Sequence, residues 1–124
     1  MSKIYDNYIK EFSDFLDEYD KGIMGPGKIA SIGCRFTQYM AECGKEQFGR
    51  EVLYNIQHRD IINGNDPQTG KPFSSVKADV LADATEEYKN YKEAKNDYES
   101  ISQMVAALAR LQKASMAEMG LANV

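Results

Sequence analysis

Prolines are scarce in this 124-residue chain, and that scarcity constrains its fold more than any other feature. Only Pro26, Pro67 and Pro72 occur. Because proline ends or kinks a helix, these three leave long tracts in which helices can run without interruption. A β-sandwich would need turn signals at short intervals, which the sequence does not have. The chain is therefore predicted to be all-α.

Apolar side chains recur at steps of three and four along both tracts, which is the spacing of one face of a helix. The steps predict helices over residues 2–20, 28–61 and 75–114, with a loop over 62–74 and a C-terminal tail over 115–124. The chain length is typical of one domain, so residues 1–124 are expected to form a single helical domain.

Turn-forming and capping residues mark the helix boundaries. Three glycines and a proline fall within residues 22–27, and residues 63–73 are dense in Asn, Gly, Asp and Pro. Ser2 is expected to cap the first helix, and Ser74 or Ser75 the third. Thr85 is a further candidate cap, so the third helix either continues through residues 83–85 or breaks there.

The apolar stripe of the third helix advances by about 3.5 residues per step, the average of a coiled-coil seam. A helix over residues 75–114 would be on the order of 60 Å long. Its apolar flank needs cover, and the second helix is the one of comparable length. We therefore expect a long antiparallel helical hairpin or a three-helix, coiled-coil-like bundle.

Residues 104–111 are apolar on nearly every side, which indicates burial from more than one direction. Either the first helix or a second copy of the chain could provide that cover. We expect a homo-oligomer, because a short elongated chain has little of itself to bury such a segment. The predicted interface consists of Tyr98, Ile101, Met104, Val105, Leu108 and Leu111.

Cysteine and histidine are too few to form a zinc site or a disulfide framework. Cys34 and Cys43 are expected to be small buried side chains, and His58 is the single histidine. No nucleophile is arranged beside His58, so we predict no catalytic residues, no cofactor and no metal. The absence of a signal peptide or membrane-length apolar run predicts a cytoplasmic protein.

Two short motifs suggest ligand sites but are incomplete. Residues 22–28 match the spacing G-x4-G-K, yet Ile29 stands where a phosphate loop needs Ser or Thr, and a helix rather than a strand precedes it. A weaker hypothesis keeps an anion near Lys28, at the amides that begin the second helix. Residues 63–66 offer oxygen atoms but lack the pattern of a calcium loop.

Charge is distributed unevenly along the chain, whose formal net charge is −4. Residues 1–20 carry six acids against two lysines, and residues 21–60 carry six bases against four acids. No stretch has the dense basic character of a nucleic-acid-binding protein. Oligomerisation could still align a basic strip, which would consist of Lys28, Arg35, Lys45, Arg50 and Arg59.

The segment Gly70-Lys-Pro-Phe-Ser-Ser through Tyr88, continuing into Ala94-Lys-Asn-Asp-Tyr98, resembles the second half of small helical accessory proteins of tailed bacteriophages. That resemblance covers about half of the chain. It implies an accessory role in DNA metabolism and the cytoplasm of a bacterial host, and it carries over no catalytic residue.

The function expected from the sequence is non-enzymatic: helix-mediated protein–protein binding or oligomeric assembly, with no membrane and no small-molecule substrate as partner. Three alternatives remain open. The chain could be a nucleic-acid-binding accessory protein that uses the basic strip, or a structural component of a virion. It could also mimic DNA to inhibit a host enzyme, through the acids of the first helix: Asp6, Asp14, Asp17, Glu18 and Asp20.

Overall fold

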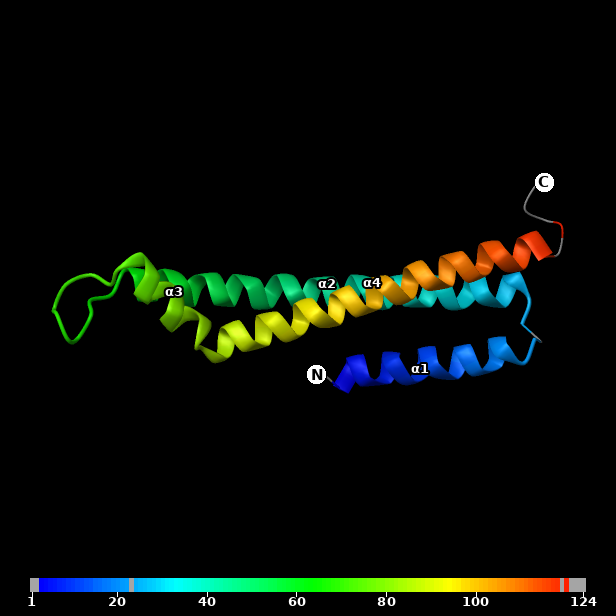
Figure 1. Cartoon of the computed structure of the whole chain (residues 1–124), viewed down its shortest axis with the longest axis horizontal. Coiled ribbons are helices and arrows are strands. Elements are labelled where there is room, and N and C mark those ends of the chain that lie inside the picture. The colour runs from blue at the N-terminus through cyan, green and yellow to red at the C-terminus, as the bar shows by residue number, and fades with distance from the viewer. Residues whose placement is uncertain (1–2, 23, 119, 121–124) are drawn as a thin grey trace. The chain divides into compact units, whose positions relative to one another are not determined.

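The computed structural model describes residues 3–22, 24–118 and 120, with side chains from residue 6 onward. The described part contains four helices: α1 (Lys3–Asp20), α2 (Pro26–Ile62), α3 (Ser75–Asp83) and α4 (Glu86–Glu118) (Figure 1). It contains no strand, and its one isolated bridge joins Asn65 to Pro72 in the loop before α3. The prediction of an all-α helical bundle is confirmed.

The helix boundaries lie close to the predicted ones at most ends. α2 begins at Pro26 rather than residue 28, because proline is tolerated in the first turn, where its missing N–H would have no partner anyway. α4 continues to Glu118, so part of the predicted tail is helical. The predicted cap Ser2 lies outside the described residues.

The tract 75–114 is not one helix, because α3 ends at Asp83 and α4 begins at Glu86. The Ser74 side chain accepts a hydrogen bond from the Lys77 amide at 3.2 Å and caps α3. Thr85 Oγ1 accepts one from the Tyr88 amide, also at 3.2 Å, at the start of α4. The same hydroxyl donates to the carbonyl of Ala82 at 2.6 Å. Both candidate caps therefore act as caps, and the alternative with a break at 83–85 is the observed one.

Tertiary contacts group the chain into two compact units. Unit 1 comprises Met1–Cys43 and Asp97–Val124, and unit 2 comprises Gly44–Asn96. α2 and α4 each continue from one unit into the other. Each unit has its own packing.

Unit 1 is a three-helix bundle of α1, the first part of α2 and the second part of α4. Glu18 pairs with Lys28 and Glu11 with Arg35, so residue numbers rise along one helix as they fall along the other. α1 and α2 are therefore antiparallel here. The core consists of two clusters of buried side chains, Phe15, Ile29, Phe36 and Leu108 in one and Tyr8, Cys43 and Ile101 in the other.

Unit 2 packs the second part of α2 against α3 and the first part of α4 around small side chains. Its buried apolar residues are Ala78, Ala82 and Ala94. Tyr54 of α2 stacks on Tyr91 of α4, with ring centroids 5.8 Å apart and 13° between the ring planes. Such a pair contributes about 0.5–1.5 kcal/mol beyond burial of its area. Small residues and half-buried rings thus take the place of the large buried aromatic and aliphatic side chains of unit 1.

Candidate functional site

The predicted interface on the last helix is part of the core of unit 1. Ile101 and Leu108 are fully buried, and the other four predicted residues pack against the same two clusters. These clusters contain side chains of α1 and α2, such as Tyr8 and Ile29. The segment is therefore covered by helices of its own chain, which corrects its assignment as a surface open to a second copy. Periodicity identified the burial correctly but could not say which helix provides it.

The predicted basic strip is divided between the units and is partly neutralised. In unit 1, Lys28 and Arg35 pair with carboxylates of α1. In unit 2, Arg50 pairs with Glu46 one helical turn away, at 2.9 Å. Lys45 is exposed and forms no ion pair with any described residue. Arg59 lies 3.7 Å from Asp60, so neighbouring acids already pair with four of the five cations. This pairing reduces the charge that a phosphate backbone would meet.

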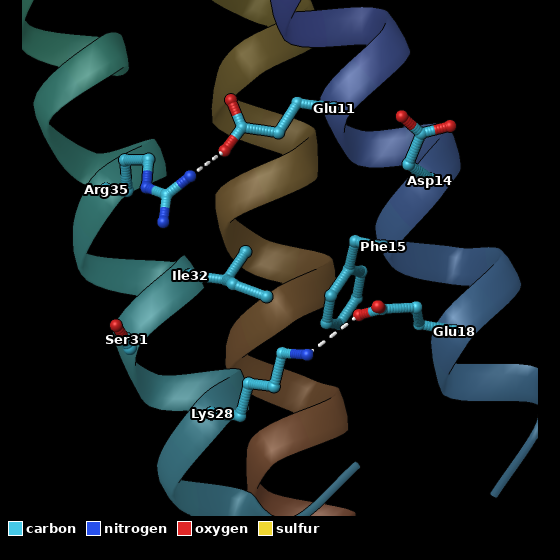
Figure 2. Close-up of a pocket in the computed structure, with 8 residues that line it drawn as sticks. All are labelled: Glu11, Asp14, Phe15, Glu18, Lys28, Ser31, Ile32 and Arg35. Carbon is cyan, nitrogen blue, oxygen red and sulfur yellow. Dashed lines mark hydrogen bonds and ion pairs between the residues drawn. The ribbon is translucent and has the colours of Figure 1, made fainter. Parts of the chain in front are cut away.

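A groove of about 370 Å³ lies between α1 and α2 in unit 1, and Figure 2 shows it. Arg35 extends from α2 to Glu11 of α1, and Lys28 extends to Glu18, with a distance of 3.0 Å between Lys28 Nζ and Glu18 Oε2. Phe15 lies between these two ion pairs. Both ion pairs are exposed, so each contributes little to stability. They link α1 to α2 across the groove.

The phosphate-loop-like segment is a turn that joins α1 to α2. The amide of Ile29 donates to the carbonyl of Gly25 at 3.2 Å, within the first turn of α2. Gly22 has a φ of 74°, a conformation that residues with a Cβ rarely adopt. The ammonium of Lys28 is engaged by Glu18. The cation that the candidate anion site at this helix start would use is thus already paired with a carboxylate of α1.

The acids of α1 lie mainly in solvent. Asp6, Asp14, Asp17 and Asp20 are exposed, and among the described side chains Glu18 is the one of the five that pairs with a cation. Exposed carboxylates on one amphipathic helix are the ordinary solvated face of such a helix. This arrangement neither supports nor contradicts the DNA-mimic alternative.

Asp66 uses both carboxylate oxygens to hold the loop before α3. Oδ1 accepts a hydrogen bond from the Gln68 amide at 2.9 Å, and Oδ2 pairs with Lys77 of α3. The bond from Lys77, and then the one from Gln68, holds the pKa of this carboxyl below its usual 3.8. No group of three or more potential metal ligands occurs among the described residues. Both side-chain oxygens of Asp66 therefore stabilise the loop.

His58 and Tyr54 join α2 to α3 through two aspartates. His58 Nε2 lies 2.8 Å from Asp79 Oδ1, and the Tyr54 hydroxyl donates to Asp83 Oδ1 at 2.7 Å. Burial, followed by this hydrogen bond, raises the pKa of Tyr54 to about 12. Tyr54 and His58 are one helical turn apart on α2, and Asp79 and Asp83 are one turn apart on α3. The two contacts are therefore neighbours between α2 and α3. The histidine is thus tied to a helix–helix contact.

The feature that sequence reasoning missed is an exposed apolar row on α2 in unit 2, formed by Phe48, Val52 and Ile56. Phe48 is 69% exposed, and both other side chains are also exposed. On a helix these three lie about 120–200° from Tyr54, which faces α3 and α4. We call this row the α2 stripe. The apolar stripe predicted for the helix over residues 28–61 included all three residues, together with Ile29, Phe36 and Cys43.

The sequence does contain a signal for the α2 stripe. The expected inward set advances by three or four residues as far as Cys43, and the next step, to Phe48, is five residues. A step of five turns the apolar phase by about 140° on a continuous helix. After that step, the later apolar residues cannot lie on the face that the earlier ones define.

A second exposed apolar pair, which we call the α3 patch, lies on α3. Val76 is 75% exposed and Val80 is 63% exposed, and they are neighbours one helical turn apart. They lie on the opposite side of α3 from the buried Ala78, by the same helical geometry. Both exposed apolar rows of unit 2 are therefore open to solvent. The α2 stripe lies away from Tyr54, and the α3 patch lies beside Asp79 and Asp83, which contact α2.

The chain matches no family model, no curated protein and no solved structure. No helix in the described part of the chain is both long enough and apolar enough to cross a lipid bilayer.

Proposed function

We propose that this chain is a non-enzymatic protein that acts by binding another protein chain through the exposed apolar side chains of unit 2. One observation carries the proposal. Of the exposed large apolar residues in the described part of the chain, all except Ile9 lie between residues 48 and 81. The α2 stripe and the α3 patch contribute five of them.

Exposed apolar area supports the proposal because it has a thermodynamic cost. Burying apolar surface stabilises a complex by about 25 cal/mol per Å² removed from water. Single exposed apolar residues are common, but several in a row on one helix face mark interaction surfaces. Phe48 in particular has the size and rigidity of an interface anchor, since aromatic side chains supply much of the energy at such sites.

The polar contacts of unit 2 also support a binding role rather than a catalytic one. Tyr54 and His58 contact Asp83 and Asp79 across the α2–α3 pair. These groups hold helices together, and α3 in turn presents the exposed patch. The resemblance of residues 70–98 to bacteriophage accessory proteins adds the setting that we propose, a host cytoplasm in which a small helical protein binds a larger one.

Site-specific photo-crosslinking tests the proposal directly. A benzophenone amino acid replaces Phe48 in the full chain, which is expressed in the native cell and irradiated. A matched control carries the same group at Gln38, an exposed residue of unit 1 whose neighbours on the helix include no exposed large apolar side chain. We expect a discrete protein adduct from position 48 and little from position 38. Equal, diffuse labelling at both positions would contradict the proposal.

A further inference from the structure

We propose that the α2 stripe of one copy of this chain binds the α3 patch of a second copy, so that the chains associate head to tail. This inference rests on the proposed function, because it names the occupant of the same surface. It is carried by the charges that flank the two apolar rows.

Two cations flank the α2 stripe, and the exposed acid Asp60 follows Ile56 one helical turn later. Lys45 lies seven residues before Val52, and Arg59 lies seven residues after it. Seven residues are two helical turns, so both cations project from the same face as the stripe, one at each end. Lys45 forms no ion pair with a described residue, and Arg59 contacts its neighbour Asp60 at 3.7 Å with both side chains mostly in solvent. Both cations are therefore available to a partner.

The charges beside the α3 patch are acidic. Asp79 and Asp83 lie on the flank of Val76 and Val80, and the chain continues into Glu86 and Glu87. Each aspartate uses Oδ1 for its contact with α2, and no described residue bonds Oδ2 of either one. The side chain of Asp79 is 64% exposed. These carboxylates can therefore accept a cation from outside without giving up the contacts that hold α3.

Symmetric pairing of two α2 stripes is disfavoured by the same positions. In an antiparallel pair centred on Val52, Lys45 of one copy would face Arg59 of the other. In a parallel pair, each cation would face its own equivalent. Both arrangements bring like charges together along an apolar contact, which is destabilising. Pairing the stripe with the α3 patch instead places cations opposite carboxylates.

The two rows differ in length. Phe48 and Ile56 are eight residues apart, which is about 12 Å along a helix, whereas Val76 and Val80 are four residues apart, which is about 6 Å. The α2 stripe is therefore long enough to cover the whole α3 patch. All five side chains are exposed, so one copy can offer both rows at once. Such a contact joins unlike surfaces and generates rings or open chains rather than closed two-fold dimers.

Two variants separate this arrangement from its alternatives. The stripe variant, Phe48→Ser with Val52→Ser, keeps an intact α3 patch. The patch variant, Val76→Ser with Val80→Ser, keeps an intact α2 stripe. All four residues are exposed, so both variants should retain the wild-type circular dichroism spectrum. The wild type and both variants are measured by light scattering up to high micromolar concentration, singly and mixed in equal amounts.

We expect the wild type to form assemblies larger than a dimer and each variant alone to associate at least about tenfold more weakly, because each lacks one half of the contact. The equal mixture should form a 1:1 dimer and nothing larger, since one intact stripe meets one intact patch. Lys45→Glu with Arg59→Glu should also weaken wild-type association by about tenfold or more, and added salt should do the same.

A monomeric wild type overturns the inference, and so does a patch variant that dimerises as well as the wild type or a mixture that forms no dimer. Failure here can be told apart from failure of the proposed function. An adduct from position 48 that contains a different protein leaves the proposed function standing and removes the self-pairing. No specific adduct at position 48 removes both.

Discussion

The hydroxyl of Tyr54 donates a hydrogen bond to Asp83 Oδ1 at 2.7 Å, and this bond ties the last third of α2 to the last residue of α3. Together with the contact between His58 and Asp79, it sets the face that α3 turns inward. With α3 in this orientation, Val76 and Val80 lie in solvent. The exposed surface of unit 2 therefore depends on a pair of polar contacts that no apolar pattern encodes.

Replacing Tyr54 with Phe removes this hydrogen bond and keeps the ring stacked on Tyr91. We expect a loss of about 1 kcal/mol in the free energy of unfolding. Amide hydrogen exchange should also accelerate in α3, because α3 loses one of its two polar contacts to α2. Asp60→Asn serves as the control, since Asp60 is exposed and contacts only the adjacent Arg59 among described residues. Unchanged exchange in α3 would show that the bond contributes nothing to docking.

The pH dependence of stability should also report on Tyr54. Its pKa is raised from 10.0 to about 12, so the folded state favours the neutral hydroxyl. The stabilisation is complete below pH 10 and is lost as the pH rises towards about 12. In a titration of tyrosinate absorbance, Tyr54→Phe should remove signal from the upper end of the curve. Removal of signal centred at pH 10 would mean that Tyr54 titrates as it does in water.

Asp66 should keep its charge well into the acid range. Its carboxyl pKa lies below 3.8, chiefly because Lys77 bonds to it. Its contribution to stability is therefore present above about pH 4 and is lost as the pH falls through its folded pKa. A carbon-13 NMR titration should place the Asp66 midpoint below 3.8. Asp66→Asn should speed hydrogen exchange in the loop 63–73 at neutral pH, and a midpoint at or above 3.8 would refute the pairing.

Leu108 should behave as a core residue of a single chain. It is 1% exposed and packs with Phe15, Ile29 and Phe36. Leu108→Ala is expected to lower the free energy of unfolding by about 2–5 kcal/mol, independently of protein concentration. The neighbouring exposed residue provides the matched control, because Ala109→Ser should change the stability little. A loss of stability that disappears at high concentration would instead place Leu108 at an interface between copies.

The two thiols should differ in reactivity. Cys34 is exposed and Cys43 is buried, so the expectation that both are buried is wrong for Cys34. A disulfide reagent added to the native protein should modify one thiol rapidly and the second only on unfolding. Cys34→Ser should remove the fast phase and leave the slow one. Two fast equivalents in the wild type would mean that the core around Cys43 opens readily.

Local patterns in the sequence predicted the helices well, because helix formation depends on side chains three and four residues apart and on capping groups at the ends. The bounds predicted for α1 and α2 from spacing lie within two residues of the observed ones, and Ser74 was one of the two candidate caps for α3. At residues 83–85 two local signals led to different predictions. The apolar spacing continued as in a single helix, whereas Thr85 indicated the start of a new one. Only the packing of α3 on α2 resolved that disagreement.

What the sequence determined by itself is which residues are helical and which of them need cover. What only the tertiary structure decided is the source of that cover. Residues 101–111 are covered by α1 and α2, and Phe48, Val52 and Ile56 are left uncovered. The physical reason is that the hydrophobic effect scales with buried area and has no direction. A periodic pattern can state that a face must be buried, but the neighbour that buries it is set by contacts between residues far apart in the chain.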